Sequence, residues 1–275
     1  MVSSQISRPR RGDRVRDSTV EYGTIEVVPQ DDFDREFGAN YSNAHLTALG
    51  PTRRGKTRRV RRLLKVVATP ERKATILHGK IKGRDTEIPD TARDLNMRII
   101  DEYPPEYSFR DRNRRGYILL PLSRETGSVE EENAILKREY SKAIHSCYQS
   151  KKPCILVLDE SHQAQETLGL KKQIEGPLMR GLPDCAEWNL IQRGRFVSYH
   201  CYDAPEHLLL YYDPDVNNQK RYSEIGGVDP EYIRRVCAGL QTRTIKVNGG
   251  RDAATISECL YIRRGGPYLC IVSMD

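Results

Sequence analysis

The chain has 275 residues, a length that suits one α/β domain of ordinary size, with or without a tail. Hydrophobic residues make up 37% and charged residues 30%, and the formal net charge of +7 favours polyanionic partners such as nucleic acid. No apolar run approaches about 18 residues and none of the seven cysteines stands in CxxC spacing, which excludes a membrane-spanning helix and argues against a disulfide framework or a zinc site.

Basic residues gather in two stretches. Residues 1–18 are polar and rich in arginine, which predicts a flexible tail in front of a single domain over residues 19–275. Residues 53–65 hold a second group of arginines and lysines. Clustering of this kind favours contact with a phosphate backbone, although a solvated charged surface is the ordinary alternative.

The first half of the chain alternates between apolar runs and helical patterns. Its expected strands are 24–28, 45–49, 74–78, 97–101 and 117–122. Residues 56–67 predict a helix, because their apolar residues fall on one helical face. Residues 31–41 predict a loop or a short helix, and the Pro-, Tyr- and Arg-rich residues 103–115 predict a loop.

The second half continues the alternation. Residues 129–149 have helical spacing, with glutamates early and lysines later, as the helix dipole favours. Residues 154–158 (CILVL) form a continuous apolar run typical of a central parallel strand, and a helix is expected over 230–240. Further strands are expected at 196–201, 207–212, 259–262 and 268–273. Strands that alternate with helices predict an α/β fold with a mainly parallel central sheet.

Residues 50–57 (GPTRRGKT) match the phosphate-loop pattern GxxxxGK[ST] at every fixed position, between a predicted strand and a predicted helix. The glycines let successive N–H groups point at phosphate oxygens, and the helix adds its positive end. Lys56 would supply a charge to the β- and γ-phosphates, and the Thr57 hydroxyl would ligate Mg²⁺. The ordinary alternative is a glycine-rich turn. The predicted nucleotide-binding residues are Gly50, Pro51, Thr52, Arg53, Arg54, Gly55, Lys56, Thr57 and Arg58.

Residues 154–160 (CILVLDE) fit the Walker B pattern of an apolar strand followed by an acid. Asp159 would hold Mg²⁺ at the tip of the strand, and Glu160 would act as general base toward water. The ordinary alternative is a strand that ends in acidic turn residues. The two motifs are too far apart for adjacent strands joined by one helix, which leaves room for an extra strand between them. The sequence therefore predicts a RecA-like P-loop NTPase of the additional-strand, catalytic-glutamate division, with ATP and Mg²⁺ as ligands.

With both motifs placed, the sequence from about Phe33 to the C-terminus resembles the FtsK/HerA superfamily of DNA-pumping ATPases. It is most similar to the short single-domain ATP-binding proteins of bacterial viruses. HLTALGPTRRGKT resembles the family's first strand and Walker A motif, ILHGKIKGRD the strand and turn that follow, and LVLDES the Walker B motif. Residues 191–205 (IQRGRFVSYHCYDAP) and 211–233 resemble later segments, in which a GR pair precedes a strand that ends in a polar sensor.

The resemblance implies further catalytic residues. The family's sensor strand ends near a glutamine in a TQ-x-P-like run, whereas residues 202–205 here are YDAP. An ionised Asp203 would accept hydrogen bonds only, so it could position water but could not donate to the γ-phosphate. Arg195 or Arg193 would be a finger that reaches a neighbouring subunit's nucleotide, with surface loop arginines as the alternative. The predicted catalytic residues are Glu160, Lys56, Arg195 and Asp203.

Several other side chains have ordinary interpretations. Lys82, Arg84 and Asp85 predict loop charges, with DNA contact as the alternative. His162 predicts a local hydrogen-bonding residue, and Trp188 a core or interface residue.

Two classes of function fit these observations. The first is a motor, a homo-oligomeric ring (hexamer or pentamer) in which ATP hydrolysis moves double-stranded DNA during viral genome packaging or DNA transfer. Its partners would include a viral portal or another DNA-handling protein, and its location would be the cytoplasm, the host's if the protein is viral. The second is an ATP-binding switch or scaffold with little hydrolysis and no translocation, which Asp203 in place of glutamine favours. A packaging enzyme with a nuclease fits less well, since the residues after Walker B hold no clustered acids for two metals.

Overall fold

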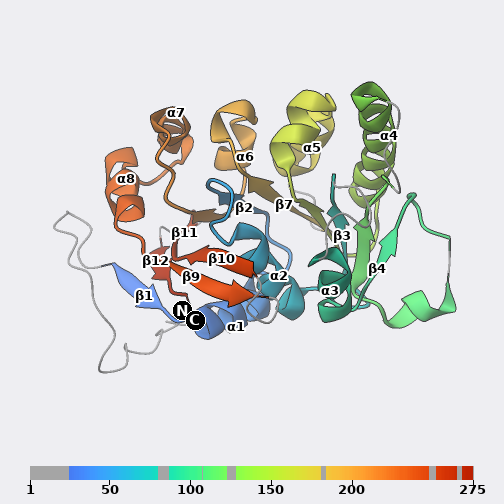
Figure 1. Cartoon of the computed structure of the whole chain (residues 1–275), viewed down its shortest axis with the longest axis horizontal. Helices are drawn as coiled ribbons and strands as arrows, with labels where there is room; N and C mark the ends of the chain where they lie inside the picture. The colour runs from blue at the N-terminus through green and yellow to red at the C-terminus, as the bar shows by residue number, and fades with distance from the viewer. Residues whose placement is uncertain are drawn as a thin grey trace.

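The computed structural model describes residues 25–79, 87–106, 108–122, 128–180, 184–247, 252–264 and 268–274. These residues form a ten-stranded sheet with helices on both faces, and a separate two-stranded hairpin (Figure 1). The predicted basic tail over 1–18 and the loop residues Lys82, Arg84 and Asp85 lie outside the described residues. None of the helices in these ranges combines the length and the apolar character needed to cross a membrane.

Most of the large sheet is parallel, as the alternation of strands and helices predicted. The parallel strands are, in spatial order, β8 (His207–Leu210), β2 (Leu46–Leu49), β7 (Cys185–Ile191), β6 (Cys154–Leu158), β3 (Lys73–Leu77), β5 (Gly116–Leu119) and β4 (Met97–Ile100). Beyond β8, β11 (Cys259–Arg263) runs antiparallel to β12 (Tyr268–Val272), and β1 (Glu26–Val28) lies parallel to β12 at the edge. β7 therefore lies between the phosphate-loop strand β2 and the Walker B strand β6, which confirms the predicted extra strand.

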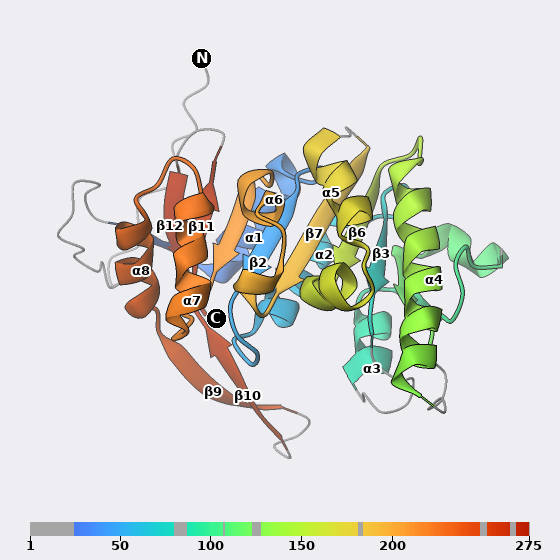
Figure 2. The ribbon, with the colours of Figure 1, turned by 90° about the horizontal axis from the view of Figure 1, so that it is seen from above.

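Helices divide between the two faces of the sheet (Figures 1 and 2). One face carries α1 (Gln30–Asn40), α2 (Lys56–Val67) and α3 (Glu87–Asp94). The opposite face carries α4 (Val129–Tyr148), α5 (Lys171–Arg180), α6 (His200–Asp203), α7 (Val216–Gln219) and α8 (Pro230–Ala238). Shorter helical turns are η1 (Phe109–Asn113), the π-helix η2 (Gln163–Thr167), η3 (Gly194–Phe196) and η4 (Lys220–Glu224).

Apolar side chains fill both interfaces between helices and sheet. The α2 face predicted from its spacing is buried, and its members are Val60, Leu63, Leu64 and Val67. Trp188 of β7 is fully buried in the same cluster, with its ring centre 6.0 Å from that of Phe37. Its indole N–H donates to the carbonyl of Ala44 at 3.0 Å, which satisfies the polar atom of an otherwise apolar side chain. On the other face, α4 buries Tyr140 and Ile144.

One strand expected from the sequence is absent, and one strand of the structure was not predicted. The expected strand over 196–201 is absent: Val197 N–H donates to the Gly194 carbonyl and Cys201 N–H to the Ser198 carbonyl, so tight turns replace it. The strand between β2 and β6 is instead β7, formed by the preceding residues 185–191 (CAEWNLI), for which no element was predicted. Its polar Glu187 hid the strand, because a charged residue interrupts the apolar pattern.

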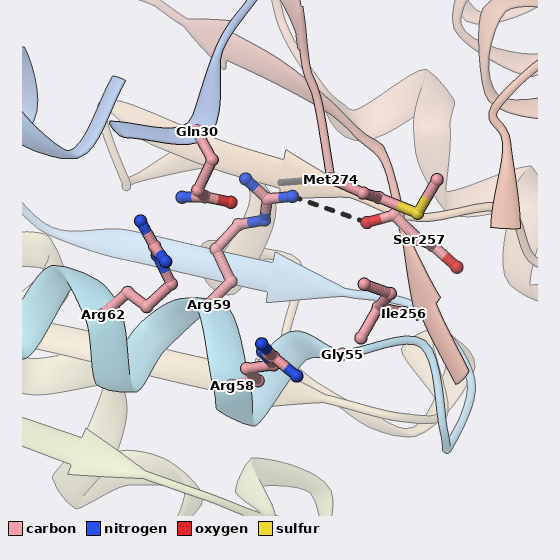
Figure 3. Close-up of a pocket in the computed structure, with 8 residues that line it drawn as sticks. All are labelled: Gln30, Gly55, Arg58, Arg59, Arg62, Ile256, Ser257 and Met274. Carbon is pink, nitrogen blue, oxygen red and sulfur yellow. Dashed lines mark hydrogen bonds between the residues drawn. The ribbon is translucent and has the colours of Figure 1, made fainter. Parts of the chain in front are cut away.

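The hairpin was also missed. Among the described strands, β9 (Thr242–Val247) and β10 (Asp252–Ser257) pair only with each other, in antiparallel fashion. They stand away from the large sheet near the start of α2 (Figure 2). The hairpin joins the body where Glu258 N–H donates to the Gln241 carbonyl at 3.0 Å. Its inner end lies beside the phosphate loop (Figure 3), since a Cβ on Gly55 would be 3.6 Å from Cα of Ile256.

Candidate nucleotide-binding site

The phosphate loop connects the end of β2 to the start of α2. Gly50 has no room for a side chain, because a Cβ there would lie 2.6 Å from Cβ of Tyr211. Gly55 adopts a left-handed conformation (φ 85°) that glycine tolerates without strain, and it begins α2 without a side-chain cap. The first intrahelical bond runs from Arg59 N–H to the Gly55 carbonyl, so the N–H groups of residues 56–58 precede it at the helix end. This end of α2 is suited to an anion.

Lys56 is folded under the loop. Its ammonium donates to the carbonyl oxygens of Gly50 at 2.5 Å and Pro51 at 2.7 Å, and the residue is only 6% exposed. Burial lowers the pKa of Lys56 to about 8, an effect that the nearby carboxylates Asp159 and Asp213 oppose. A phosphate group in the loop would offer this ammonium an anionic partner in place of two neutral carbonyls.

The Walker B strand brings Asp159 to the phosphate loop. The Thr57 hydroxyl donates to one carboxylate oxygen of Asp159 at 3.2 Å, and His78 Nδ1 lies 2.9 Å from the other. Burial opposes ionisation of Asp159, but the hydrogen bond and charge of His78 outweigh it and lower the pKa of Asp159 below its usual value. A hydroxyl and an ionised carboxylate are oxygen ligands of the kind that Mg²⁺ prefers, so the residues present fit this ion.

Glu160 contacts Gln192, a residue for which no role was predicted. Gln192 follows directly after β7, and its side-chain amide donates to the Glu160 carboxylate at 3.3 Å. Since β7 and β6 are adjacent and parallel, their carboxyl ends deliver Gln192 and Glu160 to the same edge of the sheet. The signal was present in the sequence, as a glutamine directly after the apolar Leu190 and Ile191. It could be recognised only once β7 was known to be a strand.

Asp203 and Arg195 lie elsewhere. The placement of Asp203 at the end of a strand was wrong: it lies in α6, where it accepts a hydrogen bond from Arg264 at 3.0 Å. Arg195 is exposed in η3, with its guanidinium carbon 4.5 Å from the ring centre of Phe196. Both side chains line a surface hollow beside η3, and no phosphate-loop residue is among the described residues that line it. Arg193, the other candidate finger, is exposed on the same loop.

Comparisons with known proteins bear on the fold. No protein-family model matches the sequence, and no curated protein matches it. B204, the DNA-packaging ATPase from Sulfolobus turreted icosahedral virus, is similar in structure with a TM-score of 0.50 at 12% identity, over 85% of this chain and 98% of that one. The genome packaging NTPase B204 of Sulfolobus turreted icosahedral virus 2, in complex with AMP, has a TM-score of 0.48 at 10% identity, over 85% and 98% of the two chains.

A third protein is similar to this chain over part of its own length. EccC (ATPases 2 and 3) of Thermomonospora curvata has a TM-score of 0.44 at 13% identity, over 87% of this chain and 38% of that one. At identities this low, the structural similarity bears on the fold alone. The activity of this chain has to be argued from its own residues. The chain therefore shares the fold of B204 and has the features of a P-loop NTPase fold: a phosphate loop, a Walker B strand and an extra strand between the two.

Proposed function

We propose that the chain is an ATP-hydrolysing motor that translocates double-stranded DNA as one subunit of a homo-oligomeric ring. The proposal is carried by five side chains that lie together at the carboxyl ends of the adjacent strands β2, β7 and β6. They are Lys56, Thr57, Asp159, Glu160 and Gln192. Phosphoryl transfer to water needs a phosphate cradle, a metal-holding pair and a group that activates water. This edge offers side chains for each.

Nucleotide binding would begin at the loop. The N–H groups at the start of α2 would donate to phosphate oxygens, and the Lys56 ammonium would exchange its two carbonyl acceptors for phosphate oxygens. Thr57 and Asp159 would hold Mg²⁺, which supplies charge neutralisation to the β- and γ-phosphates when it is bound. The existing contact between Thr57 and Asp159 keeps both oxygens close to where the ion is needed.

Hydrolysis would depend on Glu160 and Gln192. The Glu160 carboxylate removes a proton from the attacking water as the water approaches the γ-phosphorus. The Gln192 amide holds Glu160 in place through its N–H, and unlike a carboxylate it can also donate to the γ-phosphate. Arg195, exposed on the loop after β7, would complete a neighbouring subunit's site by stabilising charge in the transition state.

DNA is the proposed polyanion because exposed cations gather near the same edge. Arg53 and Arg58 are exposed at the phosphate loop, and Arg243 and Lys246 are exposed on β9. Neutralising backbone phosphates releases counterions and gives sequence-independent binding, which suits a protein that moves along DNA. Viral genome packaging, with a portal as partner in the host cytoplasm, is the process we favour, and DNA transfer is the other.

The switch or scaffold alternative loses its main support. It rested on an aspartate at the sensor position, whereas the glutamine that contacts Glu160 is Gln192. Asp203 instead forms an ion pair with Arg264 on the surface.

Steady-state ATP hydrolysis, measured with and without double-stranded DNA, tests the proposal. We expect DNA to stimulate turnover in the wild type and Glu160→Gln to reduce it by at least about 100-fold, because the amide cannot accept the water proton. Glu166→Gln, which changes an exposed glutamate on η2, is the matched control. ATP binding with background turnover in the wild type, with or without DNA, would contradict a motor.

A further inference from the structure

The loop that carries Arg195 is hydrogen-bonded to the segment that follows the Walker B strand. Residues 192–199, which we call the arginine loop, leave the carboxyl end of β7 and lead into α6. Near the end of this loop, the backbone N–H of Ser198 donates to the side-chain oxygen of Gln165 at 2.8 Å. Gln165 lies in η2, which follows Glu160 along the chain. One side chain therefore joins the segment of Glu160 to the loop of Arg195.

Gln165 is also held from its other end. Its amide N–H donates to the Ser161 hydroxyl at 2.9 Å and lies 3.2 Å from the sulfur of Cys201. The Ser161 hydroxyl donates in turn to the side-chain oxygen of Asn189 in β7 at 2.7 Å. Because Ser161 is the residue directly after Glu160, this chain of hydrogen bonds runs from the reacting edge of the sheet to the arginine loop.

The members of this chain are withdrawn from water. Ser161 is fully buried, and the exposed fractions of Gln165 and Ser198 are 2% and 3%. A buried donor or acceptor that loses its protein partner has no water to replace it, so such a loss is costly. We therefore expect the segment after the Walker B strand and the arginine loop to move together.

The helix that carries Gln165 is irregularly wound. Leu168 N–H donates to the Gln163 carbonyl at 3.0 Å, which makes η2 a π-helix. π-helices are rare and are found frequently at functional sites. Within η2, Gln165 is buried whereas the next residue, Glu166, is exposed. The irregular winding supports a role for Gln165 beyond filling the core.

The opposite side of the arginine loop is held as well. The Asn218 side-chain oxygen accepts a hydrogen bond from the backbone N–H of Arg195 at 3.2 Å, and Arg221 Nη2 donates to the Val197 carbonyl at 2.6 Å. The loop leads into α6, which lies between α5 and α7 (Figure 1). The Arg195 side chain is exposed. The backbone is thus fixed from two sides while the guanidinium is presented outward, as action on a neighbouring subunit requires.

We propose that Gln165 positions Arg195 for the nucleotide site of the neighbouring subunit, by tying the arginine loop to the Walker B segment of its own subunit. The inference rests on the proposed function, in which Arg195 acts on a neighbour. Movement of Glu160 on ATP binding or hydrolysis would then reach the next site through Ser161 and Gln165. Loss of the tie would leave a subunit's own Glu160 intact and deprive its neighbour of a well-placed Arg195.

Steady-state ATP hydrolysis by Gln165→Met measures the effect of the tie. Methionine keeps the length of the side chain and removes both hydrogen-bonding atoms. We expect kcat to fall at least about tenfold, because a small misplacement of a group that stabilises the transition state has a large effect on rate. KM should change by less than about threefold, since the subunit's own nucleotide contacts remain. Glu166→Met, at the exposed neighbouring position, is the matched control.

Mixed assemblies show in which subunit Gln165 acts. Gln165→Met subunits keep Glu160, and Glu160→Gln subunits keep a well-placed Arg195. In an equal mixture about one site in four combines both, so turnover should rise to about a quarter of the wild-type rate, far above either variant alone. Arg195→Ala mixed with Glu160→Gln is the reference and should recover equally. Ser161→Ala, a smaller change in the same chain, replaces Gln165→Met if that variant does not bind the β,γ-imido analogue of ATP.

The outcomes separate the inference from the proposed function. Turnover of Gln165→Met within about twofold of the wild type would overturn the inference. A loss that Glu160→Gln subunits do not restore, although they restore Arg195→Ala, would overturn it too, because Gln165 would then act within its own subunit. If Arg195→Ala keeps wild-type turnover, or is not restored by Glu160→Gln, the proposed action of Arg195 on a neighbour fails and the inference falls with it.

Discussion

Gln192 had no predicted role in the sequence, yet it lies in the candidate site of the structure. Its amide lies 3.3 Å from the Glu160 carboxylate, at the edge where the phosphate loop and Asp159 also meet. If Glu160 is the general base, as we propose, an amide in this position can orient it and also donate to the γ-phosphate. Both tasks matter more in the transition state than in the ground state, so Gln192 should affect turnover more than nucleotide affinity.

Replacement of Gln192 by alanine tests this role. We expect kcat for ATP hydrolysis to fall by about 10- to 100-fold while KM changes by less than about threefold, because the lost contacts belong to the reacting end of the nucleotide. The loss should exceed that of Asp203→Ala by at least about tenfold. Gln173→Ala, on the exposed side of α5, should leave both constants near wild type. A larger effect of Asp203→Ala than of Gln192→Ala would restore the original assignment.

At the scale of elements, β7 carries a buried carboxyl group in the centre of the sheet. Glu187 is fully buried, accepts a hydrogen bond from Asn189 at 2.8 Å, and has one carboxyl oxygen without a partner among the described residues. Burial raises the pKa of Glu187 to about 8, so the folded protein keeps it protonated at neutral pH. Ionisation of Glu187 therefore disfavours the folded strand.

The raised pKa of Glu187 predicts a pH-dependent stability. Between about pH 5 and pH 8 the unfolded chain releases the proton while the folded chain keeps it, so stability falls as pH rises through this range. Glu187→Gln removes this dependence, and its stability advantage over the wild type should grow by on the order of 2 kcal/mol between pH 6 and pH 8. Thermal unfolding at pH 6 and pH 8 measures it, with the exposed Glu130→Gln of α4 as control. An advantage that stays constant or shrinks with pH would contradict the account.

The elements that could be predicted from sequence are those specified by nearby residues. The phosphate loop, α2 and the Walker B strand each carry a local pattern of glycines, apolar spacing or a terminal acid, and the structure has them where expected. β7 could not be predicted, because its polar residues are stabilised by distant partners. Glu187 N–H donates to His45 and the Asn189 side chain accepts from Ser161, and neither contact is visible in the strand's own sequence.

The candidate site divides in the same way. Lys56, Thr57, Asp159 and Glu160 belong to contiguous motifs, and their approach to one another follows from parallel strands that end at one edge. Gln192 belongs to no such motif, and only the pairing of β7 with β6 brings it to the site. The hairpin could have been predicted, because residues 248–250 (NGG) are a hairpin turn signal and Ile245 and Val247 alternate with polar residues, although the segment as a whole is polar and basic.

The whole molecule presents its nucleotide edge and its exposed cations together. The phosphate loop, the loop with Arg195 and the basic strand β9 all adjoin the carboxyl ends of the parallel strands (Figure 2). A ring built from such subunits could place one subunit's arginine loop beside its neighbour's nucleotide, and the exposed cations beside DNA. ATP turnover would then be coupled to movement along the duplex.

The measurement that tests this claim most directly is ATP-driven displacement of a triplex-forming oligonucleotide from double-stranded DNA. A protein that moves along the duplex removes the third strand from its path, whereas one that only binds DNA leaves it in place. We predict displacement by the wild type that requires ATP and is abolished by Glu160→Gln at equal DNA occupancy. A wild type that hydrolyses ATP and binds the duplex, yet leaves the third strand in place, would contradict a translocating motor.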